Sequence, residues 1–226
     1  MLTAIVTAGG AGVRFGGEKI LSPVRGEPLV FHTVRRIGRL AGVARVFLVL
    51  PPSRLPAIRE EHGEALERLG VTDWIPGGTT RMESVGNGLA AAETGFVLVH
   101  DAVRPRFDVA AADRAVELAR ESGAAIVAVP ARDTLKRVDG EHRIAGTVPR
   151  EEVWHAETPQ VMRREVLVEA YRRAEADGFV GTDEASLVER IGVPVSVVDG
   201  GPWNVKVTER EDLAVVTALL GGEGSR

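Results

Sequence analysis

The sequence predicts an α/β protein in which helices cover both faces of a mostly parallel β-sheet. Three observations support this prediction. Short runs of almost continuous hydrophobicity alternate with stretches of helical periodicity, a glycine-rich segment follows the first run, and 226 residues suffice for one α/β domain. Hydrophobic residues make up 44% and charged residues 27% of the chain, a balance that excludes disordered and fibrous classes.

Each element follows from a local pattern. The apolar run at residues 2–7 ends in AGGAG and predicts a buried strand that enters a glycine-rich turn. Further apolar runs predict strands at residues 43–50, 96–100, 124–129, 193–198 and around 205. Apolar residues at helical spacing predict helices at residues 28–40, 55–69, 81–92, 110–121, 164–176, 183–191 and 209–220.

The pattern changes between residues 131 and 160. The stretches DTLKRV and RIAGTV lie on either side of DGEH, an arrangement typical of a β-hairpin. Because an isolated hairpin is only marginally stable in water, we expect this one to pack against a second subunit. The chain shows no internal repeat or linker. It therefore predicts a single Rossmann-like domain over residues 1–226, with an inserted β-hairpin as a dimerisation arm at about residues 132–153.

Composition limits the cellular setting and the partners. No apolar run approaches the ~20 residues of a membrane helix. The N-terminus lacks the basic start of a secretory signal and the chain has no Cys, so we expect a cytoplasmic protein without a membrane anchor. The net charge of −4 argues against a nucleic-acid partner, although a small anionic substrate needs only a local group of cations. Lysine occurs only at Lys19, Lys136 and Lys206 in a chain rich in arginine, so each lysine is a candidate for a specific role.

The glycine-rich segment TAGGAGVRFGGEK (residues 7–19) predicts an anion-binding turn, because glycines let backbone N–H groups approach a phosphate closely. A P-loop would need Lys where Glu18 stands, and the dinucleotide fingerprint would need Gly where Phe15 stands. Neither motif applies. The turn is long and contains Arg14 and Lys19, which favours a triphosphate cradle over an ordinary strand-to-helix turn.

Seven stretches occur in the order found in one enzyme family. They are AGGAGVR with the Lys that follows it, GGTTRMESV (77–85), VHDAVRP (99–105), PARDTLKR (130–137), TVPREEVWHAETPQ (147–160), TDEAS (182–186) and NVKVT (204–208). Together they resemble the 2-C-methyl-D-erythritol 4-phosphate cytidylyltransferases, enzymes of non-mevalonate isoprenoid synthesis, over nearly the whole chain. Two departures stand out. Glu18 and Ile20 flank the lysine where the family usually has Pro and Gln, and Thr79 replaces an acidic residue.

The resemblance implies that a phosphate oxygen of a polyol phosphate attacks the α-phosphorus of CTP and releases pyrophosphate. The nucleophile is already an anion, so the reaction needs cations, backbone donors and a divalent metal, with Mg²⁺ as the expected ion, rather than a general base. By the same resemblance, Arg14 and Lys19 stabilise the charge that develops on the transferred and leaving phosphates. Lys206 would bridge the α-phosphate and the incoming phosphate.

The remaining site residues are also implied by the resemblance. Asp101, just after the strand at residues 96–100, is expected beside the substrate hydroxyls and as the metal ligand. Arg150 is expected to cross from the partner subunit of a homodimer. The residues expected to contact CTP are Ala8, Gly9, Gly10, Gly78, Thr79, Ser84 and Ala102. The residues expected to hold the polyol phosphate are Arg104, Thr134, Arg150, Thr158 and Thr182.

Two alternatives stay open at this point. The same turn would serve another acceptor, such as ribitol 5-phosphate, and a non-catalytic CTP sensor would signal through the arm. A sensor has no need of three cations, Arg14, Lys19 and Lys206, aimed at one phosphorus, so catalysis is favoured. His100 is expected to be a packed side chain at the end of a strand and Lys136 to be structural.

Overall fold

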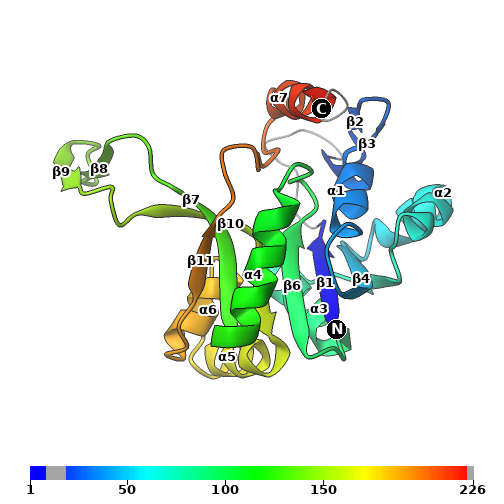
Figure 1. Cartoon of the computed structure of the whole chain (residues 1–226), viewed down its shortest axis with the longest axis horizontal. Coiled ribbons are helices and arrows are strands. Elements are labelled where there is room, and N and C mark those ends of the chain that lie inside the picture. Colours follow the sequence, from blue (N-terminus) through cyan, green and yellow to red (C-terminus); the bar gives the residue numbers. More distant parts are fainter. Residues whose placement is uncertain (9–18, 223–226) are drawn as a thin grey trace.

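A seven-stranded sheet forms the middle of the computed structural model, which describes residues 1–8 and 19–222 (Figure 1). Its strand order is β11-β7-β10-β6-β1-β4-β5. The strands are β1 (Leu2–Thr7), β4 (Val43–Leu50), β5 (Asp73–Pro76), β6 (Phe96–Asp101), β7 (Ala124–Pro130), β10 (Trp154–Arg163) and β11 (Ser196–Asp199). β10 runs antiparallel between β6 and β7, and the other neighbouring pairs are parallel. The predicted α/β class, with a mostly parallel sheet, is confirmed.

Helices cover both faces of this sheet. One face packs against α1 (Leu29–Ile37), α2 (Leu55–Arg68) and α4 (Val109–Ser122), and the other against α3 (Arg81–Ala91), α5 (Arg164–Ala176) and α6 (Glu184–Arg190). Ala4 and Val6 of β1 join the first core and Ile5 joins the second, because successive side chains of a strand point to opposite faces. Every residue of β1 is buried, as its unbroken apolar run predicts.

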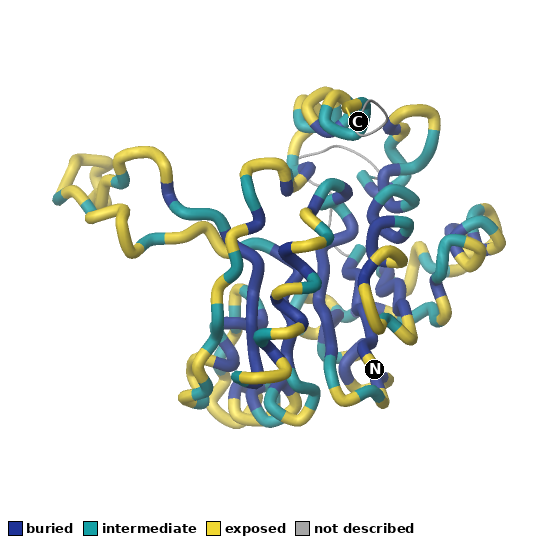
Figure 2. Tube along the Cα trace, viewed as in Figure 1, coloured by how far each residue is buried: buried dark blue, intermediate teal, exposed yellow. Residues whose placement is uncertain are grey.

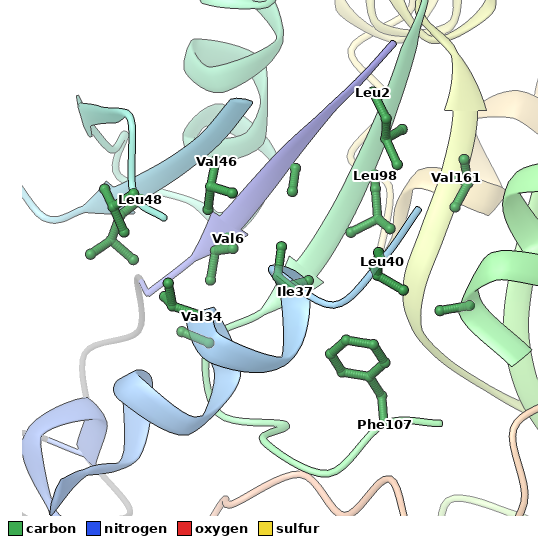
Figure 3. Close-up of a cluster of buried hydrophobic side chains, with 14 of the residues drawn as sticks. Leu2, Val6, Val34, Ile37, Leu40, Val46, Leu48, Leu98, Phe107 and Val161 are labelled. Carbon is green, nitrogen blue, oxygen red and sulfur yellow. The ribbon is translucent and has the colours of Figure 1, made fainter. Parts of the chain in front are cut away.

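The core beneath α1 shows how helix and sheet interlock. Figure 3 shows Val34 and Ile37 of α1 facing Val6 of β1, with the ring of Phe107 nearby. Phe107 is fully buried and packs edge-on against His100, with ring centroids 4.6 Å apart. This contact ties the segment after β6 back to β6, and Arg36 of α1 donates to the Phe107 carbonyl. It fixes the backbone on which Asp101 and Arg104 stand.

Three details of the predicted elements differ from the structure. The strand expected around residue 205 is wrong, because residues 200–207 are irregular. Val207 N donates to the Val103 carbonyl at 2.9 Å, and the Asn204 carbonyl accepts from Arg104, so this backbone bonds to a loop and not to a strand. The short strand β5 was not predicted. β10 was not predicted as a strand either, because WHAETPQVMR is not an apolar run, and neither was its antiparallel direction.

The predicted hairpin is present. β8 (Leu135–Val138) and β9 (Ile144–Val148) pair antiparallel, and Figure 1 shows them projecting away from the sheet on two extended connections. Most of this arm is exposed (Figure 2). Lys136 Nζ donates to Thr147 Oγ1 across the hairpin at 2.7 Å, which agrees with the structural role expected for it.

A small layer lies over the edge of the sheet where the parallel strands end. It consists of η1 (Lys19–Leu21), β2 (Pro23–Val24), β3 (Glu27–Pro28) and α7 (Asp212–Gly221). Val24, Leu29, Val207 and Val216 form its separate buried core. Among residues 1–8 and 19–222, no helix is both long enough and apolar enough to span a membrane.

Candidate active site

Three neighbouring parallel strands, β1, β4 and β6, end at one edge of the sheet and bring distant segments together there. Thr7 of β1 is in register with Val49 of β4 and with Asp101 of β6. Beyond the strands, Ala8 N donates to the Val49 carbonyl and Ala102 N donates to the Thr7 carbonyl, each at 2.9 Å. Ligands of open α/β sheets bind at this edge. Ala8 and Ala102, both predicted CTP contacts, are therefore neighbours at the expected place.

Asp101 is the centre of a group of charged side chains at this edge. Lys206 Nζ lies 2.8 Å from Asp101 Oδ2, and Arg104 Nε lies 3.5 Å from the same oxygen. Arg81 Nε lies 3.4 Å from Oδ1. We call Asp101 with Lys206, Arg81 and Arg104 the Asp101 cluster. Glu184 pairs with Arg81 at 2.8 Å and Glu157 lies 3.5 Å from Arg104, so carboxylates offset these two arginines. Lys206, whose side chain is 43% exposed, is the cation of the cluster that is most open to a phosphate.

The carboxylate of Asp101 is ionised although it is buried. Burial by itself raises the pKa of Asp101, but Lys206 and Arg81 outweigh that effect and hold the pKa well below its usual range. Arg104 acts in the same direction. Asp101 is therefore a fixed negative charge at physiological pH, and its cationic neighbours are aligned by it.

A chain of hydrogen bonds supports Asp101 from beneath. Asp101 N donates to Thr158 Oγ1 at 3.1 Å, and Thr158 Oγ1 lies 3.0 Å from His100 Nδ1. His100 Nε2 lies 2.9 Å from the Arg104 carbonyl, which only accepts, so Nε2 carries the proton and Nδ1 accepts from Thr158. Complete burial lowers the pKa of His100 to about 4, so the ring is neutral. Its position agrees with the packed, non-catalytic role expected for it.

The segment that carries Lys206 is attached to both sides of the site. Arg104 Nη1 donates to the Asn204 carbonyl at 2.6 Å, and Asn204 Nδ2 donates to the Thr158 carbonyl at 2.7 Å. On the other side, Lys19 Nζ donates to the Thr208 carbonyl at 3.1 Å. Lys19 and Lys206 thus belong to one connected unit at the carboxyl edge, as their predicted roles require.

The predicted cytidine turn lies at the start of α3. Gly78 N donates to Ser84 Oγ at 3.1 Å, and Ser84 Oγ donates to the Thr80 carbonyl at 2.8 Å. A Cβ on Gly78 would lie 2.3 Å from Glu83 Cβ, so only glycine fits there. Glu83 Oε2 accepts from both the N–H and the hydroxyl of Thr79, at 2.7 and 2.6 Å. Glu83 thereby brings a carboxylate to the position where Thr79 departs from the family pattern.

Arg81 and Glu184 are site residues that our sequence reasoning missed. Arg81 Nη1 and Nη2 donate to the two carboxylate oxygens of Glu184 at 2.8 and 3.0 Å. The Glu184 side chain is only 1% exposed. Both lie inside quoted motifs, GGTTRMESV and TDEAS, but one arginine among so many carries no sequence signal of its own.

Several predicted residues do not join the Asp101 cluster within one protomer. Thr134 and Arg150 are exposed at the base of the arm, where Arg150 Nη1 donates to the Arg132 carbonyl. Thr182 is exposed just before α6. The predicted residues that lie outside the described part of the chain are Gly9, Gly10 and Arg14.

The donor set permits one kind of metal site. Within residues 1–8 and 19–222, no group of three or more His, Asp or Glu side chains is arranged to hold a metal ion. Magnesium commonly takes only one or two protein carboxylates and completes its shell with phosphate oxygens and water. Asp101, an ionised carboxylate at the phosphate edge, fits that pattern as a single protein ligand, and a metal ion there would displace Lys206 or an arginine from its oxygens.

The fold and this site define an α/β nucleotidyltransferase, and comparison with known proteins gives its family. The model of the 2-C-methyl-D-erythritol 4-phosphate cytidylyltransferase family (IspD) matches residues 2–222. The enzyme of that name from Aquifex aeolicus is 40% identical over 225 residues, which cover 99% of each chain. The crystal structure of the Thermus thermophilus enzyme of that name superposes with a TM-score of 0.79 at 33% identity, covering 96% of this chain and 98% of the other.

A third comparison gives the same answer. The crystal structure of the 4-diphosphocytidyl-2C-methyl-D-erythritol synthase from Anaerococcus prevotii superposes with a TM-score of 0.84 at 28% identity, covering 97% of this chain and 98% of the other. The chain belongs to the 2-C-methyl-D-erythritol 4-phosphate cytidylyltransferase family. It is a CTP-dependent cytidylyltransferase of isoprenoid precursor synthesis, as the sequence resemblance implies.

Proposed function

We propose that the Asp101 cluster is where CMP passes from CTP to 2-C-methyl-D-erythritol 4-phosphate. One observation supports this assignment above the others. An ionised carboxylate lies between three cations at the carboxyl edge of the sheet, where Ala8 and Ala102 converge. Lys206 is the most exposed cation of this group, so a phosphate that binds at this edge meets its ammonium group beside Asp101.

The reaction forms one P–O bond and breaks another. A phosphate oxygen of the acceptor attacks the α-phosphorus of CTP, and the bond from that phosphorus to the oxygen it shares with the β-phosphorus breaks. Pyrophosphate leaves with the bonding electron pair. No proton needs to be removed, because the attacking oxygen is already anionic. This agrees with the neutral, buried state of His100, whose two ring nitrogens are bonded to the Arg104 carbonyl and to Thr158.

The cations take the roles that this charge movement requires. Lys206, whose side chain is 43% exposed, reaches into the edge while Asp101 holds its ammonium group. It contacts the α-phosphate and the incoming phosphate together. Lys19 stabilises the leaving pyrophosphate from the opposite side of the Lys206 segment, and Arg14 shares that task. A compact ammonium suits a charge that moves during the reaction, and Arg104 with its fixed fork suits the bound acceptor.

We also propose Mg²⁺ as the metal ion of this reaction, with Asp101 as its protein ligand. When bound, the ion would neutralise charge on the triphosphate of CTP. Thr182 completes the acceptor site on the side of α6.

The arm supports a further part of the proposal, a homodimer with shared sites. Val138 and Ile144 of the arm are 52% and 66% exposed, and Trp154 at its base is 40% exposed. Large apolar side chains that gather on an exposed surface often mark an interface with another protein chain. A two-stranded hairpin alone is also only marginally stable in water. In the dimer, Thr134 and Arg150 of each protomer hold the acceptor phosphate in the partner's site.

Complementation between two inactive variants tests the shared site. Arg150→Ala and Lys206→Ala protomers are mixed, unfolded and refolded together. In a two-fold dimer, random pairing restores one complete site in each mixed dimer, so about one quarter of wild-type activity returns. If Arg150 serves its own protomer, the mixture stays as inactive as its components.

Substrate selection tests the reaction itself. Pyrophosphate release is followed with Mg²⁺, CTP and 2-C-methyl-D-erythritol 4-phosphate, and in parallel with ATP, GTP or UTP and with ribitol 5-phosphate. Release with CTP and the methylerythritol substrate alone is the expected result. Release with ribitol 5-phosphate alone would move the acceptor assignment, and CTP binding without release from any pair would favour a sensor.

A further inference from the structure

Arg81 uses every nitrogen of its guanidinium group at the edge of the site. Nη1 and Nη2 face the two oxygens of Glu184 at 2.8 and 3.0 Å, while Nε lies 3.4 Å from Asp101 Oδ1. A planar fork held by two bonds at one end has a fixed orientation, so the direction of Nε is fixed as well. Glu184 thus orients Arg81, and Arg81 orients the side of the Asp101 carboxylate that Lys206 does not reach.

Glu184 is itself rigidly placed. It is the first residue of α6, whose N-cap Asp183 accepts from Ser186 N at 2.9 Å. Gln160 of β10 holds this turn from the other side, since its Oε1 accepts from Ala185 N at 3.0 Å and its Nε2 donates to Asp183 Oδ2 at 2.9 Å. The position of Glu184 is therefore set by the sheet and transmitted to the site through Arg81.

The pair also joins the three segments that carry predicted substrate contacts. Arg81 begins α3, directly after the turn with Gly78 and Thr79. Glu184 follows Thr182 by two residues, and Asp101 ends β6. A buried ion pair is a costly way to gain stability, since apolar residues of similar volume often serve as well. The placement of this pair therefore points to a role in geometry.

We infer that Arg81 and Glu184 are a positioning pair for CMP transfer, in which Glu184 fixes Arg81 and Arg81 fixes the carboxylate of Asp101. Neither residue touches the reacting phosphorus. Their contribution is to hold Asp101, and through it Lys206, in the arrangement that the transition state requires. This inference deepens the proposed function and rests on it.

The double variant Arg81→Met/Glu184→Met separates positioning from stability. It removes both charges at once, so no lone charge stays buried, and we expect a thermal midpoint close to that of the wild type. If the pair positions Asp101, kcat falls at least about tenfold, and falls more than the KM for CTP rises, because a misplaced group can cost about 10²-fold in rate. A double variant with wild-type kcat would overturn the inference.

A matched control comes from the exposed pair of Arg45 and Asp73, which is also two-pronged, with bonds of 3.1 and 2.8 Å. It lies at the opposite end of the sheet from the site. Arg45→Met/Asp73→Leu should leave kcat unchanged. The wild-type assay tests the proposed function separately, because an inactive wild type refutes that function while an active double variant refutes only the positioning role.

Arg81→Lys keeps the inference testable should the double variant fail to fold. Lysine preserves the positive charge beside Glu184 but cannot bond to Glu184 and Asp101 in one fixed plane. We expect a folded protein whose kcat is lowered at least about fivefold, since orientation rather than charge is lost. Wild-type kcat in a folded Arg81→Lys protein would overturn the inference.

Discussion

His100 should make the protein less stable as the pH falls, and its contribution can be separated from that of the other titrating groups by a single substitution. The imidazole is fully buried, and its pKa is lowered from 6.5 to about 4, chiefly by that burial. Above pH 6.5 the ring is neutral in both states and contributes no pH dependence. Between pH 6.5 and about 4, the unfolded chain takes up a proton that the folded chain refuses, so stability falls as pH falls. At about 1.4 kcal/mol per pH unit, the loss reaches about 3 kcal/mol.

The measurement is urea unfolding of the wild type and of His100→Gln at several pH values from 7 to 4. Glutamine cannot titrate, and its amide can donate to the Arg104 carbonyl in place of Nε2. The variant starts from a lower stability because it loses the ring contact with Phe107. Its stability should then fall less with acid than that of the wild type, by about 3 kcal/mol over the range. Equal falls in the two proteins would refute a neutral, buried His100.

The other predictions concern turnover and packing. Lys206→Ala should lower kcat/KM by at least about 100-fold. It should also lower the urea midpoint, because the buried Asp101 loses the cation that most lowers its pKa. Arg114→Ala, which removes an exposed cation on α4, should leave both unchanged, and equal kinetics in the two variants would remove Lys206 from the mechanism. Gly88→Ala should destabilise the protein by about 1–3 kcal/mol, because the alanine Cβ would lie 2.7 Å from Ile5 Cγ2. Alanine favours helices more than glycine does, so a raised urea midpoint would contradict this prediction. Phe107→Ala should cost about 3–5 kcal/mol in the same assay, and a loss below about 1 kcal/mol would show that the site under α1 can collapse.

Much of the fold could be predicted because buried strands and helix faces are rich in apolar residues at regular spacings. β1 and β6 each have four apolar residues among six, a composition typical of strands covered on both faces. The strand predicted around residue 205 is absent, although apolar and polar residues alternate in NVKVT (residues 204–208) as they do in a strand. Val207 of this segment is buried in the small core with α7, and its backbone bonds to the Val103 loop. Alternation of apolar and polar residues indicates which side chains are buried. It does not indicate whether the backbone pairs with a neighbouring strand.

Site residues within recognisable motifs could be predicted from the sequence. Site residues whose role depends on a side chain distant in the sequence could not. Asp101, Lys206 and Arg104 were predicted from motifs. In the structure, nitrogen atoms of Lys206 and Arg104 lie 2.8 and 3.5 Å from Asp101 Oδ2. Glu184 was not chosen, because a glutamate in the first turn of a helix is an ordinary feature of sequences. The fold brings the start of α6 to the start of α3, and there the Glu184 carboxylate is buried and bonded to Arg81. The sequence does not show this contact.

The position of β10 bears on how the molecule is made. β6 and β7 are not neighbours, and the gap between them is filled only by β10, which follows them in the chain. A nascent chain that ends near residue 130 therefore carries a β7 with neither of its neighbours and a β6 with one open apolar edge, both of which invite aggregation. β7 and β10 pair antiparallel, and the arm is the loop that joins them. Insertion of β10 thus joins β6 to β7 and draws the two ends of the arm together, before β11 pairs with the other side of β7. In the proposed homodimer, a partner would therefore meet a closed arm only after β10 has been synthesised and inserted.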